Sequence, residues 1–156
     1  MIAVEKSIKE SALPNSKKLK FCSYLLPSLS GLDGDTANSL LVDVKSFFDN
    51  AYHKKFTFDE FRGGFFKNAV PTTVNTAMVA RAVSLYLKKG NEDAYFSLFK
   101  DRVENFLKYH VVTSDDMEKW QTPQAKKKVL GGMKYNFKSR NVYTVATAQS
   151  LLFFTE

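Results

Sequence analysis

Apolar side chains recur along the middle of the chain with the period of an α-helix. Between residues 40 and 51 they fall at i, i+1, i+4, i+7, i+8 and i+11, which places them on one side of a helix. These residues are Leu40, Leu41, Val44, Phe47, Phe48 and Ala51. Asp35 or Thr36 can cap such a helix, because its side chain can accept a hydrogen bond from a free backbone N–H. The spacing therefore predicts an amphipathic helix that begins near residue 35 and ends near residue 51.

A second helical pattern covers residues 72–110 and divides at Gly90. Pro71 is tolerated in the first turn of a helix, Gly90 is expected to end that helix, and Asn91 is expected to cap the next one. The pattern thus predicts an αα-hairpin with a tight turn. The expected buried positions are Val79, Ala80, Val83, Tyr86 and Leu87 in the first helix, and Tyr95, Leu98, Phe99, Val103, Phe106 and Leu107 in the second.

Three other segments are ambiguous. Residues 19–26 are apolar enough for a short strand or a buried helix, and residues 27–34 have the composition of a loop. Residues 142–154 carry a helical stripe, although the sequence VYTV within them would suit a strand. Gly63 and Gly64 interrupt a helical pattern and predict a kink, an early helix end or a close backbone approach.

Several amphipathic helices with short connections predict a mainly α fold. We expect a compact single-domain helical bundle of about five to seven helices over residues 1–156. A short strand or hairpin from the N- and C-terminal segments is the alternative for the ambiguous residues. A hydrophobic content of 44% lies far from that of a disordered chain. The single cysteine excludes an internal disulfide and a cysteine-rich zinc site.

The sequence shows no targeting segment. Charged residues within the first ten positions interrupt any apolar core of a secretory signal. The apolar stretches near residues 21–29 and 142–154 are too short and too polar to span a bilayer. We therefore expect a soluble protein without a membrane partner, located in the cytoplasm or, for a viral protein, in the virion or host cytoplasm.

Positive charge is concentrated in one part of the chain. The net charge is +7, and residues 1–118 are nearly neutral, with 16 Lys and Arg against 15 Asp and Glu. Residues 119–140 contain no acid and hold Lys119, Lys126, Lys127, Lys128, Lys134, Lys138 and Arg140. A second cluster consists of Lys17, Lys18 and Lys20. Such concentrated charge favours an anionic partner over a merely solvated surface.

Aromatic residues are interleaved with the basic ones. Met133, Tyr135 and Phe137 alternate with Lys134 and Lys138, so an extended segment would place rings on one side and cations on the other. If the rings are exposed, bases of a single strand can stack on them while lysines meet phosphates, and Tyr143 is a further candidate for stacking. If the rings are buried, the lysines only solvate a surface.

Candidates for catalysis are few. His53 and His110 both stand at predicted helix ends, where a cation is favoured, and Cys22 lies among apolar residues. No phosphate-binding loop of the GxxxxGK type occurs, and the acidic residues have no calcium-loop spacing. We expect a non-enzymatic protein without a metal or cofactor.

Paired phenylalanines supply a different kind of candidate surface. Two adjacent rings on a helix cannot point the same way, and Phe65 and Phe66 are the best candidates for a docking surface. The leading hypothesis is a small basic protein that contacts the phosphate backbone of DNA or RNA, such as a packaging or accessory factor of a virus or mobile element. The alternatives are an interaction or inhibitor module that binds an acidic protein surface, and a self-assembling homo-oligomeric subunit.

Overall fold

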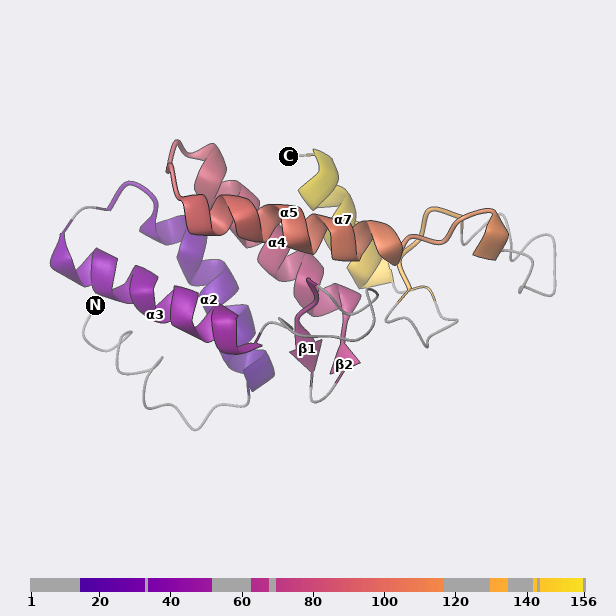
Figure 1. The fold of residues 1–156 in the computed structure, drawn as a ribbon, viewed down its shortest axis with the longest axis horizontal. Helices are drawn as coiled ribbons and strands as arrows, with labels where there is room; N and C mark the ends of the chain where they lie inside the picture. The colour runs from indigo at the N-terminus through magenta and orange to yellow at the C-terminus, as the bar shows by residue number, and fades with distance from the viewer. Residues whose placement is uncertain are drawn as a thin grey trace.

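The computed structural model describes residues 15–32, 34–51, 63–67, 70–116, 130–134, 142 and 144–155. Over these ranges the protein is mainly helical, which confirms the predicted fold class (Figure 1). The helices are α2 (Asn15–Leu29), α3 (Asp35–Ala51), α4 (Thr73–Lys88), α5 (Ala94–Tyr109) and α7 (Thr144–Thr155). Two short strands, β1 (Phe66–Lys67) and β2 (Val70–Pro71), pair antiparallel. None of these helices has the length and apolar content needed to cross a membrane.

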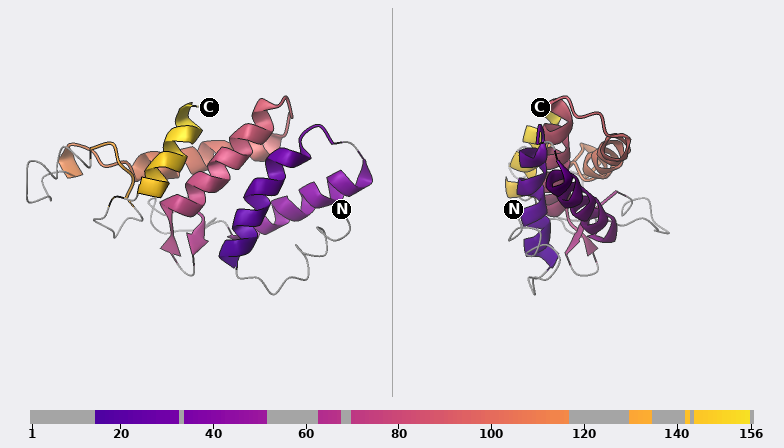
Figure 2. Two further views of the ribbon diagram at one scale, coloured as in Figure 1. Left: turned by 180° about the vertical axis from the view of Figure 1, so that it is seen from behind. Right: turned by 90° about the vertical axis from the view of Figure 1, so that its left-hand side faces the viewer.

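The helices form two layers, and α4 is the centre of the first. α2 packs along one side of α4 and α7 along the other, so the three lie next to one another (Figure 2). The second layer consists of α3, which packs on α2, and α5, which packs on α4. Helix α4 therefore has neighbours on three sides, and this explains why apolar and small polar side chains are buried along nearly its whole length.

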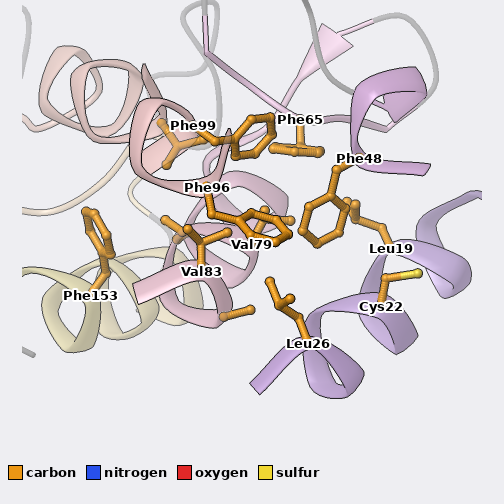
Figure 3. Close-up of a cluster of buried hydrophobic side chains, with 14 of the residues drawn as sticks. Leu19, Cys22, Leu26, Phe48, Phe65, Val79, Val83, Phe96, Phe99 and Phe153 are labelled. Carbon is orange, nitrogen blue, oxygen red and sulfur yellow. The ribbon is translucent and has the colours of Figure 1, made fainter. Parts of the chain in front are cut away.

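Three phenylalanine rings meet where the layers join (Figure 3). Phe48 of α3, Phe65 before β1 and Phe99 of α5 have ring centroids 5.4 to 6.0 Å apart, in edge-to-face and stacked pairs. Val79 of α4 and Leu26 of α2 belong to the same buried cluster. Helices from both halves of the chain thus share one core, which holds the first layer in a fixed arrangement.

The Gly63-Gly64 pair makes a close backbone approach, one of the three predicted outcomes. Gly63 has a φ of +94°, and a Cβ atom there would lie 2.9 Å from the carbonyl carbon of Arg102 in α5. The backbone N–H of Phe65 then donates a hydrogen bond of 2.8 Å to Oγ1 of Thr76 in α4. Glycine is required here because the chain passes directly against α5 before it joins α4.

The N-terminal ambiguity resolves as a helix. Residues 19–26 lie inside α2, and this helix continues through Pro27 to Leu29, so the predicted loop begins only at Ser30. The alternative of a strand in this segment is wrong. Leu19, Cys22 and Leu26 of this segment belong to the buried core, and α2 packs against both α3 and α4, whereas Phe21 and Tyr24 add exposed apolar area that obscures the helical period.

The predicted αα-hairpin is confirmed as α4 and α5, with two local corrections. Asp93, not Asn91, caps α5, because its carboxylate accepts hydrogen bonds from the first backbone N–H groups. Asn91 instead donates a hydrogen bond of 2.6 Å to the carbonyl of Tyr86. The predicted burial of Leu98 is also wrong: its side chain is 52% exposed, and Phe96 occupies the core in its place.

At the C-terminal end the helical stripe prevails, and α7 covers residues 144–155. Val142, before the helix, forms an isolated antiparallel bridge with Lys134. The described β-hairpin, β1–β2, comes from residues 66–71. The expectation that a hairpin would come from the terminal segments is therefore corrected, because both terminal segments that were considered for it fold as helices against α4.

The chain after α5 pairs with a later segment next to the start of α4. The backbone N–H of Val112 donates to the carbonyl of Gly132 (2.8 Å), and that of Lys134 donates to the carbonyl of His110 (2.9 Å). The Lys134 carbonyl also accepts a hydrogen bond of 2.6 Å from Oγ1 of Thr73. These contacts fix one described end of the basic segment to the helical body.

Candidate functional site

Acidic residues are confined to one of the two layers of helices, whereas cations occur in both. We call α2, α4 and α7 the acid-free layer, because these helices contain five cationic residues and no Asp or Glu. The cations are Lys17, Lys18, Lys20, Arg81 and Lys88. All acidic residues of the described helices lie in the other layer: Asp35, Asp43 and Asp49 in α3, and Asp101 and Glu104 in α5. An anion that approaches the acid-free layer therefore meets no carboxylate on these three helices.

The exposed side of α2 combines cations with aromatic rings. Lys17, Lys20, Phe21 and Tyr24 fall at i, i+3, i+4 and i+7, so they lie on one side of the helix. The side chain of Tyr24 is 66% exposed, and Phe21 is exposed as well. Neither Lys17 nor Lys20 forms an ion pair with another residue of the described ranges. Lys18 differs, because it is half-buried and acts electrostatically on the Cys22 thiol.

A groove of about 450 Å³ opens between the three helices of the acid-free layer. Lys20 and Tyr24 line it from α2, Met78 and Arg81 from α4, and Val145 from α7. Most of its lining is apolar, with the two cations among apolar side chains. The groove thus offers an apolar surface and positive charge at the same place.

One buried polar atom beside the groove, Nδ2 of Asn75, lacks a hydrogen-bond acceptor among the described residues. Asn75 lies in the first turn of α4, where its backbone N–H donates to Oγ1 of the capping residue Thr72. Its side chain also lines the groove, and its Nδ2 atom is buried without a hydrogen-bond partner among the described residues. A buried donor without a partner is costly, so an acceptor at this wall would be favourable.

Most of the predicted phosphate-binding residues of segment 119–140 lie outside the described residues. These are Lys119, Lys126, Lys127, Lys128, Lys138 and Arg140, together with the predicted stacking residues Tyr135, Phe137 and Tyr143. The sequence-based prediction for them stands untested. Proximity between this segment and the cluster at Lys17, Lys18 and Lys20 is likewise a prediction only.

Lys134 is the described cation of that segment, and it has an internal partner. Its Nζ atom lies 3.1 Å from Oδ2 of Asp116, and both side chains are about four-fifths buried. Burial alone would raise the pKa of Asp116, but hydrogen bonds from the Thr113 backbone and from Lys134 outweigh it and hold the pKa below its usual value. Lys134 thus neutralises a carboxylate of its own chain, which weakens it as a phosphate contact.

The two described candidates for catalysis, Cys22 and His110, are both buried. Cys22 is buried in the core, and burial, with a smaller contribution from Asp43, raises the pKa of its thiol to about 12. His110 is buried, stacks on Phe106 and has Nδ1 at 2.8 Å from the Phe106 carbonyl oxygen. His53 lies outside the described residues. Within the described ranges, no group of three or more His, Cys, Asp or Glu could hold a metal.

The structure corrects one of the two residues proposed for a docking surface, Phe65 and Phe66, and leaves the other untested. Phe65 is fully buried in the ring cluster between the layers and is not accessible to a partner. The side chain of Phe66 lies outside the described part of the chain. The reasoning about paired rings holds elsewhere, since Phe153 is buried against α4 while its neighbour Phe154 is exposed.

An apolar surface is found instead on α7, which contains no charged residue. Leu151, Leu152 and Phe154 are exposed along this helix. A second groove of about 540 Å³ lies beside them and is also lined by Leu130 and Val142. This surface is distinct from the groove of the acid-free layer.

Tyr24, Arg81 and Asn75 were not identified from the sequence as site residues. The spacing of Lys17, Lys20 and Tyr24 could have indicated a shared helix side once α2 was assigned as a helix. Nothing in the sequence could have placed Arg81 or Asn75 beside them, since they lie more than fifty positions away. Comparison with known proteins adds no further assignment, because the chain matches no family model, no curated protein and no solved structure.

Proposed function

We propose that this protein is a non-enzymatic nucleic-acid-binding protein that holds the phosphate backbone by charge. The observation that carries the proposal is the acid-free layer, in which three helices from distant parts of the sequence contain no carboxylate and two of them, α2 and α4, supply cations. The concentration of charge in residues 119–140 supports it independently. Nucleic-acid binding without base readout depends mainly on such positive surfaces.

The arrangement favours backbone contact over reading of base edges in a duplex. Helix α4 is enclosed by α2, α5 and α7 and cannot enter a major groove. Helix α5 begins at Ala94, directly after Asp93, whose carboxylate caps the helix and pairs with Lys45 at 2.6 Å. A recognition helix presents basic or amide side chains at its N-terminus, and an acidic start opposes this role. Lysine also acts as a point charge and does not provide the planar donor fork of arginine.

Salt dependence gives the proposal a magnitude. For single strands, log affinity falls by about 0.7 per phosphate contact for each tenfold rise in salt. Contacts from Lys17, Lys20 and Arg81 alone would weaken binding by about 20-fold between about 50 and 200 mM salt. Six further contacts from segment 119–140 would raise this loss to about 6,000-fold. The measured loss therefore indicates how much of the basic surface is used.

Fluorescence anisotropy with labelled oligonucleotides at about 50 mM salt tests the proposal. We expect the wild-type protein to bind. We expect Lys17→Glu/Lys20→Glu to lower the affinity by at least about 10-fold, because two phosphate contacts are lost. Lys126→Glu/Lys127→Glu/Lys128→Glu tests the predicted segment in the same way. Lys100→Glu on α5 is the matched control, because Lys100 lies in the other layer. Absence of binding to any oligonucleotide at low salt would overturn the proposal.

A self-assembling subunit is the second candidate, and the exposed apolar side of α7 favours it. Leu151 and Phe154 are exposed beside an apolar groove, on a helix without charge to oppose contact with a second copy. Light scattering at high concentration is expected to show oligomers that Leu151→Asp/Phe154→Asp dissociates. A mass of 17.7 kDa at all concentrations would eliminate this candidate.

A further inference from the structure

We infer that the groove between α2, α4 and α7 receives an unstacked base, so that the protein binds single strands in preference to duplex. This inference rests on the proposed function and names the form of nucleic acid that the acid-free layer would take. It concerns the groove lined by Lys20, Tyr24, Met78, Arg81 and Val145.

The shape of the site is the first argument. A volume of about 450 Å³ lies within the range of about 300 to 1,000 Å³ found for small-ligand sites. A base in a duplex is covered on both faces by its neighbours and shows only its edges in the grooves. A base can enter a recess between helices only when it is unpaired or turned out of the stack.

The chemistry of the walls is the second argument. Met78 and Val145 provide apolar contact for a flat ring, and a methionine thioether packs favourably against aromatic systems. Tyr24 stands at the groove with a largely exposed ring, which offers a stacking surface. Simple phosphate binding needs neither the apolar recess nor the exposed ring, so these features point to the base.

The position of the charges is the third argument. Lys20 and Arg81 line the same groove from different helices, so a nucleotide whose base enters it has cations from both α2 and α4 close to its phosphates. The buried amide of Asn75 can present its unpaired Nδ2 to a base carbonyl oxygen after the side chain rotates. An acidic peptide would use the cations but would not need the apolar walls, and it is one outcome of the test.

Three probes of equal length separate base recognition from charge. They are oligothymidylate of about 12 nucleotides, the abasic strand with the same number of phosphates, and the corresponding duplex. We expect the wild-type protein to bind oligothymidylate at least about 5-fold more tightly than the abasic strand, which is the lower end of the effect of stacking one base. We expect duplex to bind more weakly than oligothymidylate at the same salt concentration.

A pair of tyrosine variants supplies the control. Tyr24→Ala is expected to lose about 5-fold or more for oligothymidylate while its affinity for the abasic strand changes by less than about 2-fold. Tyr109→Ala, which removes a ring that is 59% exposed on α5, is expected to change neither affinity. Thermal unfolding of both variants should match the wild type, since both side chains lie mainly in solvent.

The other possible outcomes refute the inference, and they show whether the proposed function fails with it. Equal binding of oligothymidylate and the abasic strand would refute the base pocket and leave the proposed function intact. Equal losses for both strands in Tyr24→Ala would also refute it. Failure of all three probes to bind would overturn the proposed function together with the inference. Tighter binding of polyglutamate than of oligothymidylate would assign the groove to an acidic protein partner.

Discussion

Substitution of Gly63 by alanine would disturb the contact between α5 and the backbone that leads into β1. The backbone at Gly63 has a φ of +94°, which L residues rarely adopt, and a Cβ atom there would overlap the backbone carbonyl of Arg102. The obstacle is main chain within α5 and cannot rotate away as a side chain could. The loop or the helix must therefore shift, and Phe65 and Phe99 would lose part of their contact in the core.

Gly63→Ala carries a conformational cost and a steric cost, and the same substitution at Gly90 measures the conformational cost alone. The conformational cost of a positive φ is about 1–2 kcal/mol, and forced displacement of packed structure costs about 1–3 kcal/mol more. Gly90 has a similar φ of +86°, but a Cβ atom there would meet nothing within 4 Å. We expect Gly63→Ala to lower the free energy of unfolding by about 2–5 kcal/mol and Gly90→Ala by only about 1–2 kcal/mol.

Urea unfolding followed by circular dichroism measures both variants on the same scale. Two-state analysis with unchanged m values gives the difference between the two losses, which is the steric contribution alone. We expect that difference to be at least about 1 kcal/mol. Equal losses for Gly63→Ala and Gly90→Ala would refute the close approach of this loop to α5.

Three further predictions concern the core and the ion pair. Because burial raises the pKa of the Cys22 thiol to about 12, dithionitrobenzoate at pH 8 should label it only as fast as the protein unfolds, and rapid labelling of the native protein would contradict its burial. Asp116→Asn should cost about 1 kcal/mol at pH 7, since the ion pair with Lys134 is lost. Because the pKa of Asp116 is lowered in the fold, this stabilisation is present above its unfolded value of about 3.9 and disappears as the pH falls through the folded value, so urea unfolding of wild type and variant should converge in acid. Phe48→Ala should cost about 3–5 kcal/mol in the same assay, because it empties the centre of the ring cluster, and a loss below about 1 kcal/mol would place Phe48 outside the core.

Local sequence patterns predicted three of the helices correctly, because residue spacing and turn residues are sufficient to define them. The stripe from Leu40 to Ala51 and the hairpin around Gly90 are set by spacing and turn residues, and α3, α4 and α5 follow them. The cap of α5 was assigned two residues too early because Asn91 and Asp93 can both serve. Other contacts decided between them, since the Asn91 amide donates to the nearby carbonyl of Tyr86 and to the hydroxyl of the distant Ser30.

The proposed binding surface depends on packing between distant helices, which cannot be predicted from the sequence pattern. A run of charge can be read directly, so residues 119–140 were identified from the sequence. The acid-free layer arises only when α2, α4 and α7 pack side by side, and they come from residues 15–29, 73–88 and 144–155. Period alone could not decide residues 19–26, because the exposed rings of Phe21 and Tyr24 stand among the buried positions Leu19, Cys22 and Leu26 and obscure the apolar side of the helix.

The salt dependence of oligothymidylate binding by charge-removal variants tests the role of the acid-free layer most directly. Lys17→Ala/Lys20→Ala removes two cations from the exposed side of α2 without adding a carboxylate. We expect the slope of log affinity against log salt to become shallower by about 1.4, since each single-strand contact contributes about 0.7. Lys100→Ala, the control in the other layer, should leave the slope unchanged. A slope identical in all three proteins would show that the acid-free layer does not contact nucleic acid.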